Sequence, residues 1–243
     1  HRWDDRFWVF AVMAASSIVC GSVLARIPTG RLPDDSQAGL LASFHLVRGD
    51  RLFAIVLLGW MLLGFGWIST APLRIEYLSS KGGLNLTNSE IALLTVVIPS
   101  FTEILFLRLF GGLFDRSNFV PFRLILNVFL IISIWLFFHG ESFSTLCIAS
   151  VFTGLAFGGS SIAWSLWVTR VATPGREAAY MSIHVALTGV RGMVAPFLGY
   201  FLLLQIGFKG AAWAAVVLLI LSSLCFLGVR KNQRLIPQHA EKT

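Results

Sequence analysis

The sequence has few charged residues. Only 13% of its 243 residues are Asp, Glu, Lys or Arg, whereas 56% are hydrophobic, and the mean hydropathy is +0.78. Soluble globular domains carry about 25% charged residues, so a soluble domain with this composition could not cover its surface with polar groups. The composition excludes a water-soluble globular protein and indicates an integral membrane protein.

Cysteine is also scarce. Cys20, Cys147 and Cys225 lie far apart, in or beside apolar runs, and show no paired spacing. This pattern excludes a disulfide framework and gives no metal-binding motif, so we expect no metal and no cofactor. The first apolar run also lacks the short apolar core and the small-residue cleavage site that are typical of a secretory signal peptide.

The net charge of +7 does not indicate nucleic-acid binding. The basic residues lie between apolar runs, where they act as topology signals and contact lipid headgroups. We therefore expect membrane lipid as a partner and no nucleic acid.

Seven apolar runs are long enough to cross a bilayer as helices, which takes about 20 residues. The runs are continuous and do not alternate, which favours helices over barrel strands. The sequence predicts an all-α polytopic integral membrane protein with seven transmembrane helices, near residues 7–25, 52–73, 90–112, 122–139, 143–168, 178–204 and 211–229.

The distribution of Lys and Arg outside these runs predicts the orientation. Twelve lie in segments on one side and five on the other, so the positive-inside rule places the C-terminus in the cytoplasm and residue 1 outside. We expect a multi-pass protein of the cell membrane, the inner membrane if it is bacterial. An outside N-terminus without a signal peptide, before seven spans, is expected of a fragment whose earlier helices are missing.

A charged motif follows the third run. Gly111, Leu113, Asp115 and Arg116 form G-x-L-x-D-R, with Arg123 further along. The motif resembles the cytoplasmic loop signature of the major facilitator superfamily, in its weaker second copy between helices eight and nine. Asp115 is expected to accept hydrogen bonds from a neighbouring helix end and from arginine, which would close the cytoplasmic side. Asn118 replaces the family's glycine and is expected to keep a left-handed turn.

The sixth run strengthens the resemblance. It contains Arg191 and four residues that favour bending or close packing, and it is similar to the fifth and eleventh helices of the same superfamily. These four are Gly189, Gly192, Pro196 and Gly199. The resemblance then implies that the seven runs are helices six to twelve. Residues 1–25 would be the last helix of a truncated N-terminal bundle, 26–51 a cytoplasmic linker, 52–229 a six-helix C-terminal bundle and 230–243 a cytoplasmic tail.

Ionisable residues inside the spans are candidates for the transport site. Glu103 and Arg191 lie at about the same depth, and His184 is seven residues from Arg191 and so on the same helix face. Arg191 could bind an anionic group or pair with Glu103, and Glu103 could accept a proton. The alternatives are a structural ion pair and, for His184, a packing role.

Three local features give further expectations. Thr87 and Glu90 predict a capping box at the start of the third span. Arg74 and Glu76 predict an interfacial ion pair at the outer end of the second. The tryptophans of the spans are expected to be belt anchors or packing residues, although they could stack on a substrate ring: Trp60, Trp67, Trp164 and Trp167.

The function expected from this resemblance is secondary active transport of a small solute by alternating access. Candidate partners are an anionic substrate, protons, and the missing N-terminal bundle of the same chain. We do not expect an enzyme. The alternatives left open are an intramembrane serine protease, with Ser160 or Ser161 as nucleophile and His184 as base, and a seven-helix receptor.

Overall fold

The structure is a computed structural model that describes residues 45–80 and 83–235, together with seven positions between residues 15 and 26. The chain divides into two compact units, His1–Gln37 and Ala38–Thr243. In the first unit, residues 15–16, 18–19 and 22–23 are helical, and the Ser22 hydroxyl donates to the Ile18 carbonyl at 2.8 Å. Most of the predicted helix 7–25 and linker 26–51 lies outside the described residues.

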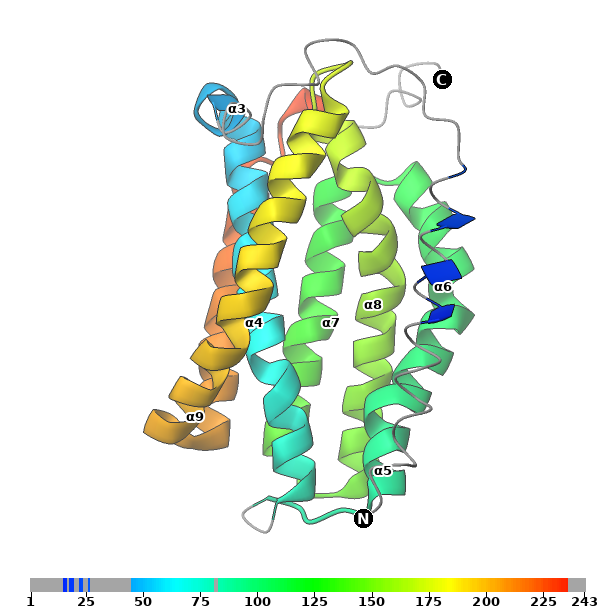
Figure 1. Ribbon diagram of the computed structural model, residues 1–243, viewed down its shortest axis with the longest axis vertical. Coiled ribbons are helices and arrows are strands. Elements are labelled where there is room, and N and C mark those ends of the chain that lie inside the picture. The colour runs from blue at the N-terminus through cyan, green and yellow to red at the C-terminus, as the bar shows by residue number, and fades with distance from the viewer. Residues whose placement is uncertain are drawn as a thin grey trace. The chain divides into compact units, whose positions relative to one another are not determined.

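The second unit is an antiparallel bundle of long helices, and its described residues contain no strand (Figure 1). The all-α membrane class is therefore confirmed. Helices α4, α7, α8 and α9 are each apolar and long enough to span a membrane, as is the continuous stretch Asn88–Arg116. The elements are α3 (His45–Gly49), α4 (Arg51–Ser79), α5 (Asn88–Ala92), the π-turn η2 (Leu93–Val97), α6 (Ile98–Arg116), α7 (Phe119–His139), α8 (Phe143–Val171), α9 (Glu177–Gly228) and the 3₁₀ turn η3 (Gln233–Leu235).

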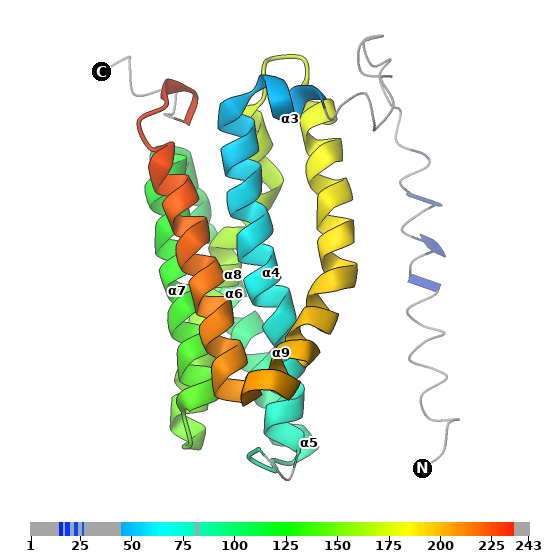
Figure 2. The same ribbon diagram turned by 90° about the vertical axis from the view of Figure 1, so that its left-hand side faces the viewer.

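Helix α9 consists of two limbs joined at one residue. Gly207 has φ 70° and ψ −178°, a conformation that suits glycine and breaks the helix. The first limb covers 177–206 and the second 208–228, and the two run in opposite directions from the junction with α4 between them (Figure 2). The described part of the chain thus holds six spans, in agreement with the six runs predicted after residue 50.

Side-chain caps explain where several helices begin. The Thr87 hydroxyl accepts from the Glu90 amide while the Glu90 carboxylate accepts from the Thr87 amide, so the predicted capping box is confirmed. Asn118 caps α7 by accepting from the Val120 amide at 3.1 Å. Its backbone is extended (φ −65°, ψ 139°), so the predicted left-handed turn is wrong: the asparagine begins a helix instead.

Helix α4 packs against both limbs of α9. Gly199 of the first limb lies directly against the Ser69 carbonyl, and Gly66 of α4 lies against the Ala215 carbonyl of the second limb. Within a bilayer, apolar side chains gain little by leaving lipid, so close packing of this kind is a main source of stability.

Basic residues gather at the end of the bundle that carries α3, here called the α3 end. Arg51, Arg116, Arg176 and Lys231 belong to segments at this end (Figure 1). The described segments at the opposite end carry two basic residues, Arg74 and Lys209, and three acidic ones, Glu76, Glu90 and Glu141. That the α3 end is cytoplasmic stays a prediction.

Candidate functional site

Arg191 lies in the interior of the bundle, on the first limb of α9. Its side chain is buried, and Nη1 donates to the Trp60 carbonyl of α4 at 2.7 Å. The guanidinium occupies the space beside Gly64, where a Cβ would lie 2.0 Å from it. Nε is buried and has no hydrogen-bond partner among the described residues. Arg191 therefore has a fixed position and an unused donor.

His184 lies two turns before Arg191, on the same face of α9, and is completely buried. Three indole rings surround its imidazole, with centroids 5.9 Å away for Trp60, 5.5 Å for Trp164 and 5.2 Å for Trp167. Neither ring nitrogen has a hydrogen-bond partner among the described residues. Three of the four tryptophans predicted as belt anchors or packing residues thus enclose a candidate proton site, and Trp67 packs elsewhere, against Phe157 and Arg74.

Arg123 also lies in the interior. It is completely buried, and its Nε donates to Asn127 Oδ1 and its Nη1 to Ser160 Oγ, both at 2.9 Å. Its guanidinium carbon lies 4.9 Å from the centroid of the Trp60 ring. Sequence reasoning grouped Arg123 with the charged loop before α7. The structure places its side chain next to Trp60, which contacts both Arg191 and His184.

The polar chain that begins at Arg123 continues across the bundle. Asn127 Nδ2 donates to Ser223 Oγ at 2.9 Å, and Ser222 Oγ donates to the Gly59 carbonyl of α4 at 2.7 Å. The sequence analysis overlooked Asn127 and Ser222. A signal was available, because Arg123 and Asn127 stand four residues apart within an apolar span, which places them on one face.

Arg74 is a third buried arginine, nearer the opposite end of α4. Its Nη1 donates to Thr153 Oγ1 at 3.2 Å, and its guanidinium carbon lies 4.1 Å from the Trp67 ring centroid. Glu76 is exposed and makes no ion pair with it, so the predicted interfacial pair is not formed. Burial over an aromatic face replaces the expected contact.

None of the three buried arginines pairs with a carboxylate within residues 45–80 and 83–235. Glu103 lies half-buried on α6 and makes no hydrogen bond or ion pair with a described residue. Glu103 and Arg191 therefore do not form the ion pair that the sequence left possible. The structure brings Arg191 and His184 together and leaves Glu103 apart from them.

Comparison with known proteins gives one match. A family model described as Major Facilitator Superfamily matches residues 77–242, which include the charged motif, Glu103, His184 and Arg191.

The chain belongs to the major facilitator superfamily. It is a membrane transporter and not an enzyme. No curated protein and no solved structure matched it.

The two alternative functions, an intramembrane serine protease and a seven-helix receptor, are both excluded. Ser160 Oγ accepts a hydrogen bond from Arg123, and Ser161 Oγ donates to the Gly158 carbonyl at 3.4 Å. His184 has no hydrogen-bond partner among the described residues, so no Ser–His dyad forms. The family match excludes the receptor as well.

The charged motif of the transporter ends helix α6. Asp115 and Arg116 are exposed there, and Leu113 is 41% exposed. An arginine was expected to donate a hydrogen bond to the Asp115 carboxylate. Arg170 of α8 donates instead to two backbone carbonyls near Asp115, those of Ser117 at 3.0 Å and Phe114 at 2.7 Å. Arg170 thus fixes the end of α6, a role that was not predicted from the sequence. Gly111 lies half-buried on α6, before this end.

The four predicted bend or packing residues have different surroundings. Gly189 and Gly192 face open space, and Pro196 lies inside the first limb of α9, where it removes one backbone hydrogen bond. Gly199 alone is in close contact, with α4.

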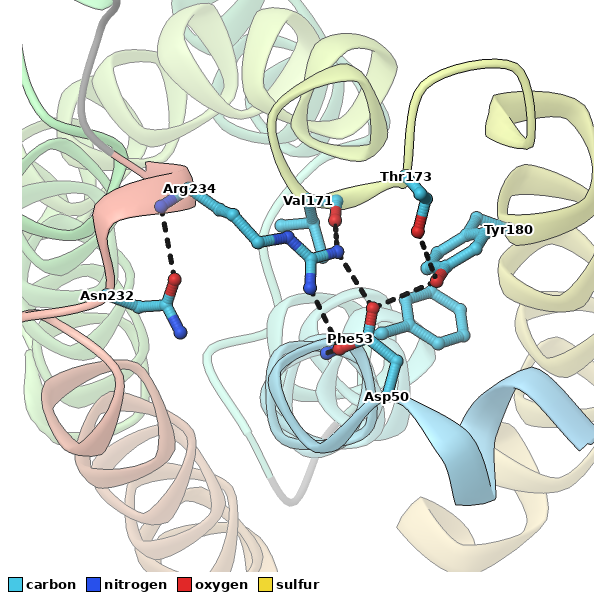
Figure 3. A network of polar contacts seen from close by, with 7 residues as sticks. All are labelled: Asp50, Phe53, Val171, Thr173, Tyr180, Asn232 and Arg234. Atoms are coloured by element: carbon cyan, nitrogen blue, oxygen red, sulfur yellow. Dashed lines mark hydrogen bonds and ion pairs between the residues drawn. The ribbon is translucent and has the colours of Figure 1, made fainter.

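A polar network ties four segments together at the α3 end (Figure 3). Asp50 accepts from Arg234 Nη2 at 2.7 Å, from the Tyr180 hydroxyl at 2.9 Å and from the Phe53 amide at 3.2 Å. Arg234 also donates to the Val171 carbonyl. The start of α4, the start of α9 and the segment after α9 therefore meet at the Asp50 carboxylate, and Arg234 joins the end of α8 to them.

Partial burial raises the pKa of the Asp50 carboxyl. The hydrogen bonds from Arg234, Phe53 and Tyr180, with the charge of Arg234, outweigh it, so the pKa lies below its ordinary value of 3.8. A depressed carboxyl pKa adds stability above the unfolded-state value, and this contribution is lost as the pH falls through the folded-state value.

We expect Asp50→Asn to lower the free energy of unfolding at pH 7 by about 1 kcal/mol, because one charged partner is lost at a partly solvated site. The difference from wild type should shrink as the pH falls below 3.8. Thermal denaturation in detergent at several pH values measures this. Asp115→Asn, an exposed acid at the same end, is the control and should change little. A difference that grows in acid contradicts the assignment.

Proposed function

We propose that this protein performs secondary active transport of a small anionic solute by alternating access, coupled to protons. The single observation that carries the proposal is Arg191, a buried guanidinium that contacts a carbonyl and no carboxylate among the described residues. A buried charge is costly unless it is paired, and intramembrane cations usually mark a solute pathway. An anionic solute would supply the missing partner.

The contact with Trp60 supports a binding role for Arg191. The carbonyl occupies Nη1 and fixes the direction of the guanidinium, Nε is buried beside Gly64, and Nη2 has no hydrogen bond to a described residue. A positioned guanidinium with unused N–H groups can bind a carboxylate or phosphate with little loss of side-chain freedom.

His184 is the proposed proton acceptor, with Glu103 as a second candidate. The face of α9 that presents Arg191 also presents His184, seven residues away. A proton on this imidazole would add positive charge near the bound anion, so each ligand would strengthen the binding of the other. The surrounding indole rings can stabilise an imidazolium.

In the proposed architecture, the spans from α4 to the end of α9 are helices seven to twelve of a twelve-helix protein, and residues 1–25 form helix six. Residues 26–51 are the linker and residues 230–243 the tail. The N-terminal bundle forms the other wall of the pathway. The basic α3 end is the cytoplasmic one, in a cell membrane, and the motif from Gly111 to Arg123 belongs to the cytoplasmic gate.

The test is uptake into vesicles that contain the product of the complete open reading frame. Radiolabelled sulfate, phosphate and small carboxylates serve as solutes, with and without an inward proton gradient. We expect the gradient to stimulate uptake. We expect Arg191→Ala to reduce it by about 30-fold, since a charged hydrogen bond contributes about 2 kcal/mol.

Arg108→Ala is the matched control, because Arg108 is exposed on α6, and it should transport like the wild type. Unchanged uptake in Arg191→Ala removes Arg191 from the site. Uptake that ignores the gradient removes the proton coupling but leaves the anion proposal intact.

A further inference from the structure

A groove opens at the α3 end, between the first turn of α4 and the segment that follows α9. Its volume is about 300 Å³, and its walls include Arg51, Leu52, Ile55, Val229, Lys231 and Asn232. We call it the basic groove. A second cleft of about 680 Å³ shares Arg51, Leu52 and Asn232 with it.

The network at Asp50 holds the groove together. Arg234 clamps the segment after α9 to the start of α4, and Leu235 beside it is completely buried. Lys231 belongs to this clamped segment and lines the groove opposite Arg51. Both cations therefore come from backbone segments that a specific ion pair keeps side by side.

No described residue balances the charges of Arg51 and Lys231 in the groove. Asp50 is the acid that lines the neighbouring cleft, and Arg234 already pairs with it at 2.7 Å. Arg51 and Lys231 are exposed and form no ion pair with any residue of the described ranges. Two adjacent cations without an acid favour a ligand that carries negative charge.

Exposed apolar side chains follow the groove residues along both helices that border the groove. Ile55 and Leu58 follow Arg51 at positions four and seven along α4, so they lie on the same face, and Leu58 is 51% exposed. On the second limb of α9, Leu224 is 55% and Leu227 38% exposed. These side chains belong to membrane-spanning helices. A ligand that fits both parts has an anionic head and hydrocarbon chains.

We infer that the basic groove binds an anionic phospholipid. Arg51 and Lys231 contact its phosphate, and its acyl chains lie along Ile55, Leu58 and Leu224. The proposed orientation places the groove at the cytoplasmic leaflet, where anionic lipids attract basic residues. The inference needs neither Arg191 nor a particular solute, so it stands apart from the transport proposal.

Native mass spectrometry of the complete protein in detergent tests the inference, with phosphatidylglycerol and phosphatidylcholine added at equal concentrations. We expect the wild type to retain at least about ten times more phosphatidylglycerol, and Arg51→Gln/Lys231→Gln to lose about 30-fold in affinity for it, since two cations near a lipid surface contribute additively. Arg48→Gln/Arg230→Gln changes the same charge at nearby exposed positions outside the groove walls and should differ from wild type by less than about twofold.

Three outcomes overturn the inference. The first is equal retention of phosphatidylglycerol by the groove variant and the wild type. The second is equal loss in the control variant, which would show that only total charge matters. The third is displacement of phosphatidylglycerol by millimolar inorganic phosphate, which would assign the groove to a free anion. Because both substituted residues are exposed, equal melting temperatures should show that the variant is folded.

Discussion

Gly199→Ala is expected to lower the free energy of unfolding by about 3 kcal/mol, at the upper end of the usual range for overpacking. The added Cβ would lie 2.0 Å from the Ser69 carbonyl oxygen and 3.1 Å from the Ser69 Cα. Both obstacles are backbone atoms of a packed helix, so no side chain can turn aside to make room. Either α4 or the first limb of α9 must move. Thermal denaturation in detergent measures the change.

The matched control for Gly199→Ala lies two turns earlier on the same limb. Gly192 has no atom within 4 Å of the position that a Cβ would occupy, so Gly192→Ala should be neutral or slightly stabilising, as alanine favours helix. If the Gly199→Ala and Gly192→Ala proteins melt at the same temperature, α4 and α9 do not pack closely at Gly199.

Gly64→Ala is expected to preserve the fold and reduce uptake about as much as Arg191→Ala does. The new Cβ would lie 2.0 Å from Arg191 Cζ and Nη1. The obstacle is here the far end of a flexible side chain, which can move aside, so we expect a smaller loss of folding free energy than for Gly199→Ala. Arg191 would then lose its 2.7 Å hydrogen bond to Trp60 and its orientation. Uptake and melting temperature must both be measured.

Gly49→Ala on α3 serves as the control for transport, because it adds the same methyl group outside the proposed gate and where no atom lies within 4 Å. A Gly64→Ala protein that transports normally would show that the solute does not depend on the observed position of Arg191. A protein that fails to fold would instead show that Arg191 cannot move.

Much of the fold could be predicted because lipid imposes simple rules on sequence. The apolar runs located the spans, and the capping box at Thr87 and Glu90 set the start of one helix. Charged side chains were harder to place. Arg74 and Arg123 stand near the ends of apolar runs, where snorkelling to the surface is the ordinary outcome. Partners distant in sequence, such as Thr153 and Ser160, bring both arginines inside.

The candidate site could be predicted only where its residues lie on one helix. Arg191 and His184 could be placed on one face from their spacing alone, because both lie on one helix. The indole rings around His184 come from α4 and α8, and no local pattern indicates that these helices meet there. The position of Glu103 relative to Arg191 likewise depends on packing between helices, which depth along a span does not determine.

The single-residue break at Gly207 has a mechanical consequence for alternating access. Because a single residue and no loop joins the two limbs of α9, neither limb can slide along the other by a helical turn without breaking the junction. Helix α4 packs closely against both limbs, so we expect these three spans to move together. Conformational freedom is then left to the remaining spans, among which α6 leaves the largest part of its surface exposed.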